Sequence, residues 1–148
     1  MLKKILIATD GSETSMRAAK MAVGIGKKAG ATVTAVYVVD VHRLAQLPGY
    51  AAMPGIKDNL MELMFKEGGE ALEEIGDMAR DAGVAYERAV AEGDPGEVLL
   101  KLCSDPGFDL IVLGTIGMSG LKRFLLGSVA EKVVRHSHVP VLVVPAIE

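Results

Sequence analysis

The sequence contains a single cysteine, Cys103. One thiol cannot form an intrachain disulfide framework or a multi-cysteine zinc site. Cys103 follows Leu99 and Leu102 on the apolar stripe of a short helical pattern, which favours a buried and unreactive thiol. With no disulfide to maintain, a reducing compartment is the expected location.

Long hydrophobic runs are also missing. The longest, at 110–113 and 139–144, have the length of a strand and fall short of the roughly 18 residues of a membrane span. Near the N-terminus, Asp10 ends an apolar run too early for a signal peptide. We therefore expect no membrane association and a cytoplasmic location.

Aromatic residues and excess positive charge are scarce. The chain has no tryptophan, and aromatic residues make up 4% of it, which leaves few platforms for stacking on nucleic-acid bases and few flanks for a flavin ring. Lysine and arginine number 16 against 19 aspartate and glutamate, a formal charge of −3, whereas general polyanion binders are strongly basic. The composition argues against nucleic acid as a partner and against a flavodoxin-like carrier.

Apolar, strand-sized runs instead alternate with segments of helical periodicity. Half of the 148 residues are hydrophobic, and this length fits one domain, residues 1–148, with its own core. The alternation predicts an α/β fold with a five-stranded parallel sheet and helices on both faces. The expected strands are 3–9, 32–39, 84–91, 109–114 and 140–145, and the expected helices are 12–28, 59–82, one from 95 onward, and 128–137.

Residues 41–58 show no clear period and include Pro48-Gly49 and Pro54-Gly55. We expect a long loop here, with a helical turn at most. Connections of this length are usually functional lids or disordered segments. In the helix that follows, Gly68-Gly69 should weaken the middle by about 1 kcal/mol per glycine relative to alanine.

The most informative segment is 114–128, with the spacing G-x2-G-x9-G-S. Glycines let the backbone turn sharply and approach a ligand closely, and successive free N–H groups can form an anion-binding nest. Gly127 and Ser128 open the next helix, whose N-terminus carries partial positive charge; Lys122 and Arg123 add cations nearby. The spacing matches neither the Rossmann nor the Walker A pattern.

Ligands of open α/β sheets bind beyond the carboxyl ends of the strands. Asp10, residues 38–40 and residues 114–117 all lie at such ends. They converge only if the first, second and fourth strands are neighbours, which the spacing alone does not establish.

The whole chain resembles the universal stress protein family. The resemblance rests on the opening K-K-I-L-I-A-T-D-G-S-E-T-S, on V-Y-V-V-D and E-G-D-P-G-E-V, and most of all on the closing G-T-I-G-M-S-G-L-K-R-F-L-L-G-S-V-A-E-K-V-V-R-H-S-H-V-P-V-L-V-V-P. The motif G-x2-G-x9-G-S is typical of the ATP-binding branch of that family. The resemblance implies an adenine nucleotide alpha hydrolase-like fold with strand order 3-2-1-4-5, and ATP as the ligand, with Mg or Mn as an optional companion.

The resemblance also implies individual roles. Thr9 and Asp10 would lie beside the nucleoside, the backbone of Val38 would contact adenine, and the motif glycines would surround the ribose and phosphates. A homodimer is implied through the last strand, at Val141, Leu142, Val143 and Val144. The full set of implied binding residues is Ala8, Thr9, Asp10, Val38, Gly114, Thr115, Gly117, Gly127, Ser128 and Val129.

Two positions depart from the family pattern and keep other functions open. Relatives often have His or Arg at the position of Ile116 and Thr at that of Ala130. One lost hydrogen bond of about 0.5–1.5 kcal/mol weakens binding by up to roughly tenfold.

The alternatives are a dimeric interaction module that binds no nucleotide and a slow ATPase. The sequence shows no Walker lysine and no positioned general base, so it predicts at most weak hydrolysis, and it does not distinguish ATP from ADP, AMP or a cyclic nucleotide.

Other candidate ligands have simpler interpretations. His136 and His138 lie near a helix end without a third residue spaced for zinc. Asp40 is interpreted as a loop carboxylate or helix cap. The methionines mostly lie on helix faces as core residues; Met53, Met61 and Met64 are the set that we considered for a dimer or ligand surface.

Overall fold

The computed structural model describes residues 1–50, 52–104, 107–115 and 126–146. Strands and helices alternate along the chain, as the pattern predicts. In order, the elements are β1 (Lys4–Thr9), α1 (Glu13–Ala29), β2 (Thr32–Val39), α2 (Val41–Ala45), α3 (Ile56–Ala82), β3 (Tyr86–Glu92), α4 (Pro95–Ser104), β4 (Leu110–Gly114), α5 (Ser128–His136) and β5 (Val141–Val144).

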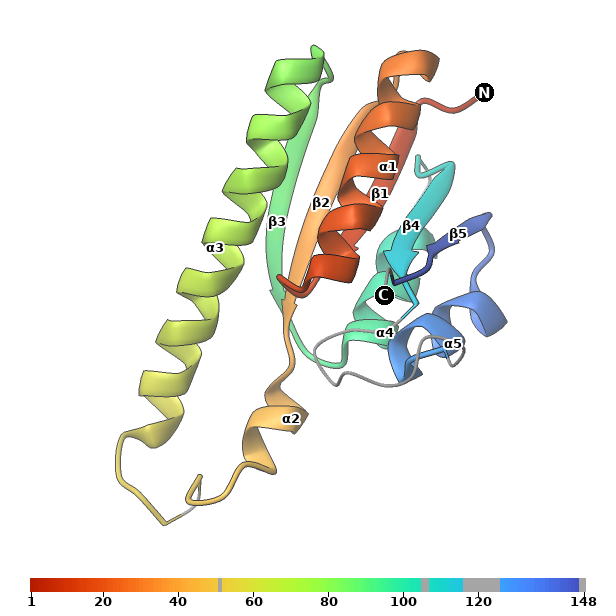
Figure 1. Ribbon diagram of the computed structural model, residues 1–148. Coiled ribbons are helices and arrows are strands. Elements are labelled where there is room, and N and C mark those ends of the chain that lie inside the picture. The colour runs from red at the N-terminus through yellow and green to blue at the C-terminus, as the bar shows by residue number, and fades with distance from the viewer. Residues whose placement is uncertain (51, 105–106, 116–125, 147–148) are drawn as a thin grey trace.

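The strands form one five-stranded sheet in the order β3-β2-β1-β4-β5, with every neighbouring pair parallel. This confirms the expected fold class and strand order. The chain passes from β1 through α1 to β2 and returns from β3 through α4 to β4, on the other side of β1. The carboxyl ends of β1, β2 and β4 therefore lie together at one end of the sheet (Figure 1). The condition that the sequence left open, that these three strands adjoin, is met.

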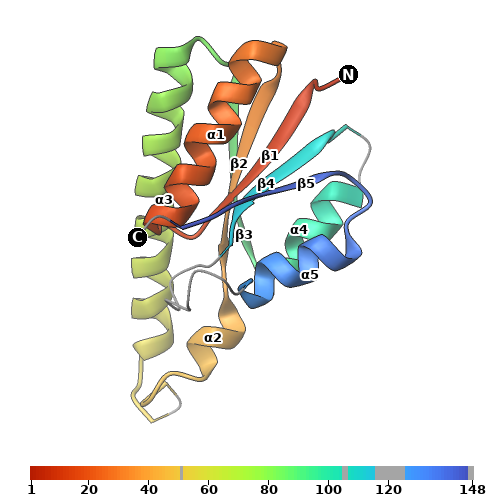
Figure 2. The ribbon, with the colours of Figure 1, turned by 45° about the vertical axis from the view of Figure 1, so that its right-hand side comes forward.

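Helices cover both faces of the sheet. In Figure 2, α1 and α3 lie on one side of the strands, and α4 and α5 lie on the other. The side chains of β1 alternate accordingly: Ile5 and Ile7 belong to the core under α1 and α3, and Leu6 to the core under α4 and α5. All three are fully buried. A strand covered on both faces needs apolar residues at every position, which explains the near-continuous apolar runs.

The prediction for residues 41–58 was only partly right. A short helix, α2, follows β2 directly because the Asp40 side chain accepts a hydrogen bond from the Arg43 N–H (3.1 Å) and caps it. The side chain of Leu44 anchors α2 in the core, with 4% of its surface exposed. Gly55, in the left-handed region (φ +79°), leads into α3 three residues earlier than expected. Asp40 is therefore a helix cap.

The third strand begins later than the sequence predicts. Gly83 adopts a left-handed conformation (φ +71°) and ends α3, and the Val84 N–H donates to the Ala79 carbonyl. Val84 thus belongs to the helix cap, and β3 begins at Tyr86. β-branched residues that follow a helix directly can serve its C-terminal motif as well as a strand, and local pattern does not separate the two.

Gly68 has a packing role that the helix pattern did not reveal. A Cβ atom there would lie 2.4 Å from the ring of Tyr37 on β2, whereas one on Gly69 would meet nothing within 4 Å. The glycine thus lets α3 approach the aromatic ring beneath it. The loss of helix propensity at Gly68 is offset by this contact.

The prediction for the cysteine agrees with the structure, and that for the methionines agrees in part. Cys103 is buried, and burial raises the pKa of its thiol to about 11, so it is protonated near neutral pH. Met61 packs against the core, whereas Met53 is 58% exposed. In the described ranges, no helix combines the length and the apolar character needed to cross a bilayer.

Candidate functional site

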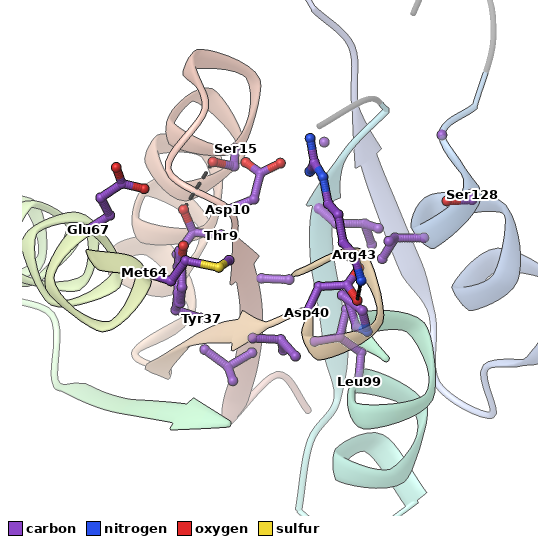
Figure 3. A pocket seen from close by; sticks show the side chains of 18 of the residues that line it. Thr9, Asp10, Ser15, Tyr37, Asp40, Arg43, Met64, Glu67, Leu99 and Ser128 are labelled. Carbon is purple, nitrogen blue, oxygen red and sulfur yellow. Dashed lines mark hydrogen bonds between the residues drawn. The ribbon is translucent and has the colours of Figure 1, made fainter. Parts of the chain in front are cut away.

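A cavity of about 560 Å³ lies where the carboxyl ends of β1, β2 and β4 meet the N-terminus of α5 and the inner sides of α2 and α3 (Figure 3). All the predicted binding residues that the structure describes line it. Gly117 lies outside the described residues, as do Ile116, Lys122 and Arg123. The lining residues that the sequence predicts are Ala8, Thr9, Asp10, Val38, Gly114, Thr115, Gly127, Ser128 and Val129.

The end of β1 is a buried hydroxyl network. Thr9 Oγ1 and Ser15 Oγ lie 3.0 Å apart, and both side chains are about 5% exposed. The Gly11 N–H donates to Thr9 Oγ1, and Ser12 caps α1 by accepting from the Ser15 N–H. Asp10 Oδ1 accepts from the Ser12 N–H (2.9 Å), so Asp10 holds the turn while Ser12 serves as the cap. This network fixes Asp10 at the cavity wall.

Thr115, directly after β4, has an unpartnered hydroxyl. Its Oγ1 atom is buried and has no hydrogen-bond partner among the residues that the structure describes. The main chain around it is held on two sides, because the Thr115 N–H donates to Val144 on β5 and its carbonyl accepts from the Gly127 N–H (2.6 Å). A buried polar group without a partner costs about 1–3 kcal/mol. Because the Oγ1 atom is closed off from solvent, a ligand in the cavity would become its partner only if the Thr115 side chain turned.

Gly114 has a structural role besides its place in the cavity wall. A Cβ atom at this position would lie 2.6 Å from Thr14 Cγ2 at the start of α1. The first glycine of the motif therefore lets α1 pack closely against the end of β4, a requirement that exists with or without a ligand.

The N-terminus of α5 opens into the same cavity. Gly127 is its N-cap, with extended backbone (φ −66°, ψ 162°), and as a glycine it has no side chain with which to cap the helix. The first N–H groups of α5 are thus left for other acceptors. Ser128, whose side chain is exposed, and Val129 follow on the cavity wall. Uncapped amides and the helix dipole together favour an anion at this point.

A salt-bridge cluster holds α5 in place against α4. Lys132 Nζ lies 3.2 Å from Asp94 Oδ2 and 3.3 Å from Glu97 Oε1. At the start of α4, Asp94 Oδ2 accepts a hydrogen bond from the Glu97 N–H, and this bond lowers the pKa of the Asp94 carboxyl. Lys132 lowers the same pKa further. A Cβ on Gly96 would lie 2.7 Å from Lys132 Cδ, so the two helices approach closely here.

Sequence reasoning did not identify the apolar wall of the cavity. Tyr37, fully buried Leu99 and Met64 line the cavity together with several leucines from α2 and α3. Met64 is thus the one of the three methionines considered earlier that reaches the cavity. The wall residues come from segments far apart in sequence, and no motif signals them. They are Val36, Tyr37, Leu44, Leu47, Leu60, Leu63, Met64, Leu99 and Leu113.

Charged side chains from α2 and α3 also face the cavity. Arg43 and Glu67 line it, in addition to Asp10 and Asp40. Burial raises the pKa of Tyr37, and the charges of Glu67 and Asp10 raise it further, while Arg43 acts in the opposite direction. Charged groups at the end of β1 and on α2 and α3 therefore act on the same buried tyrosine. Within the described ranges, no group of three His, Cys, Asp or Glu side chains is placed to hold a metal ion.

The universal stress protein family model matches residues 1–145. The chain belongs to this family. Universal stress protein MJ0531 of Methanocaldococcus jannaschii is 44% identical to it over 144 residues, covering 97% of this chain and 82% of that protein.

Solved structures of this universal stress protein family share the fold. The structure of MJ0577, from the same archaeon, matches with a TM-score of 0.84 and 31% identity, covering 100% of this chain and 99% of that one. A universal stress protein solved in complex with cAMP matches with a TM-score of 0.66 and 29% identity, covering 97% of this chain and 96% of that one.

Proposed function

We propose that this universal stress protein is an ATP-binding regulatory protein of the stress response, with the nucleotide in the cavity at the carboxyl ends of β1, β2 and β4. One observation carries the proposal. The N-terminus of α5, whose N-cap is a glycine, and Thr115 line the same cavity as the apolar wall. This combination suits a ligand with a flat apolar ring and an anionic chain. The relative solved with cAMP supports an adenine nucleotide.

Within this proposal, the nucleotide has a defined orientation. The phosphates lie against Gly127, Ser128 and Val129, where the helix amides are available. The adenosine lies toward Asp10 and the Val38 backbone, as the family resemblance implies. Leucines of α2 and α3 border the cavity and contribute apolar surface for the base.

A divalent cation fits the electrostatics of the proposed complex. Asp10, Asp40 and Glu67 line the cavity against one arginine, Arg43, among the described lining residues. A phosphate chain entering this space meets carboxylates as well as helix amides. Mg or Mn prefers oxygen ligands from carboxylates and phosphates, so it would screen the repulsion between them. We therefore propose that ATP binds with Mg or Mn.

Gly127→Val tests where the phosphates lie. The extended backbone of Gly127 is a conformation that valine adopts readily, so the variant should fold. Its side chain would occupy the space beside the α5 amides. We expect calorimetry with Mg-ATP to give a Kd in the micromolar range, roughly −8 kcal/mol, for the native chain and no measurable binding for the variant.

Gly24→Val is the matched control, because Gly24 is exposed on α1 and a Cβ there meets nothing within 4 Å. It should bind ATP like the native chain. Absence of heat and of any thermal shift with millimolar ATP for the native chain would refute nucleotide binding. Retained affinity in Gly127→Val would refute only the placement of the phosphates. The same two variants test ATP hydrolysis: turnover that takes place in this cavity should be lost in Gly127→Val and kept in Gly24→Val.

A further inference from the structure

The short helix α2 places an arginine in the cavity. Asp40 caps α2 through the Arg43 N–H (3.1 Å), the Leu44 N–H donates to the Asp40 carbonyl, and the buried Leu44 side chain anchors the helix. The backbone of Arg43 is therefore fixed relative to the end of β2. In Figure 3, its side chain extends from α2 and ends between Asp10, at the end of β1, and Ser128, at the start of α5.

Arg43 is the only lysine or arginine among the described residues that line the cavity. In this part of the chain, the ion pairs involve Arg80, Lys132 and Arg135, and none includes Arg43. Its side chain is also exposed to solvent. The guanidinium thus remains available to a ligand in the cavity.

We propose that Arg43 binds the phosphate chain of the nucleotide and makes affinity depend on the number of phosphates. The inference rests on the proposed function and extends it, because it assigns selectivity to α2, outside the glycine-rich motif. The planar guanidinium donates two parallel hydrogen bonds to phosphate oxygens, and it stays charged at every relevant pH. Three carboxylates also line the cavity and repel phosphates. The positive charge of Arg43 therefore contributes more to the binding of a polyanion than to the binding of adenosine.

The test compares ATP, ADP, AMP and adenosine, all with Mg²⁺, on the native chain and on Arg43→Gln, Arg43→Lys and Lys57→Gln. Lys57 is an exposed cation in the first turn of α3 that does not line the cavity, so its loss controls for net charge. We expect Arg43→Gln to weaken ATP about ten- to a hundredfold, ADP less, AMP little and adenosine not at all. Arg43→Lys should fall between the native chain and Arg43→Gln, and Lys57→Gln should bind as the native chain does.

The possible outcomes distinguish a role of Arg43 in phosphate binding from nucleotide binding itself. Equal ATP affinity in the native chain and Arg43→Gln would overturn the role of Arg43 and leave nucleotide binding intact. An equal loss for ATP and adenosine would also overturn it, because it would mean that Arg43 supports the shape of the cavity. Failure of the native chain to bind any of the four compounds would refute the proposed function itself. Unchanged thermal unfolding of Arg43→Gln without ligand would show that its fold is intact.

Discussion

At the scale of single residues, the cavity wall contains two kinds of position. Thr9 and Asp10 are held by hydrogen bonds that also organise the first turn of α1, so they have structural work independent of any ligand. Thr115 differs, because its buried hydroxyl forms no hydrogen bond with any residue that the structure describes. A buried polar group without a partner calls for an explanation, and a bound ligand is one of those that apply to a cavity wall. Thr115 is therefore the lining residue whose chemistry points most directly to a ligand.

Thr115→Val should change stability and affinity in opposite directions. Valine matches the shape of threonine and removes the unpartnered hydroxyl, so unfolding by urea without ligand should show a gain of about 1 kcal/mol. Mg-ATP affinity, measured by calorimetry, should fall by up to about tenfold, because one hydrogen bond to the ligand is lost. Lower stability together with unchanged affinity would show that the hydroxyl has a partner within the protein.

At the scale of elements, α3 and β2 form one wall of the cavity. Tyr37 lines the cavity and lies under Gly68 of α3, so the position of this helix depends on a close contact with an aromatic ring. The neighbouring Gly69 makes no such contact. Adjacent glycines in one helix thus provide an internal comparison between packing and helix propensity.

Gly68→Ala and Gly69→Ala should have effects of opposite sign. Alanine at Gly69 should raise the free energy of unfolding by about 0.5–1 kcal/mol through helix propensity. Alanine at Gly68 should lower it by about 1–3 kcal/mol, because the added methyl overlaps the Tyr37 ring. Urea unfolding measures both. Stabilisation by both substitutions would show that α3 does not depend on this contact.

At the scale of the whole molecule, the two edges of the sheet differ in composition. On one edge, β3 (Tyr86–Glu92) carries charged residues, which discourage pairing with another chain. On the other, β5 reads Val-Leu-Val-Val and pairs only with β4 among the described strands. Its apolar character and unpaired edge make β5 the surface through which we propose that two copies of the chain associate.

Val143→Pro should prevent this association without disturbing the sheet. The carbonyls of Pro140 and Val144 accept from β4, so by the alternation of a parallel ladder the Val143 N–H points to the open edge. We expect light scattering to report a dimer for the native chain and a monomer for this variant, with unchanged circular dichroism.

Val90→Pro on β3 is the control. The Gly93 N–H donates to Val39, so by the same alternation the Val90 N–H faces outward at the opposite edge. This variant should remain dimeric. Dimers in both variants would mean that association does not use the main chain of β5, and a monomeric native chain would refute the proposed homodimer.

How much of the fold and of the cavity could be predicted depends on whether the interactions join residues that are near or far apart in the sequence. Near-continuous apolar strands and helical periods reflect burial on each element, and they led to all five strands, one of them with a late start at Tyr86. The glycine-rich segment indicated an anion site because the backbone chemistry is local. The strand order came from the family resemblance, since periodicity does not say which strands adjoin.

The sequence by itself determined the alternation of strands and helices and the covering of both sheet faces, and its resemblance to the family implied the cavity residues of β1, β4 and α5. Only the tertiary structure decided that α2 and α3 complete the cavity, that Arg43 lines it and that the Thr115 hydroxyl has no partner in the described part of the chain. The physical reason is that burial leaves a local period in the chain, whereas contacts between distant elements leave none.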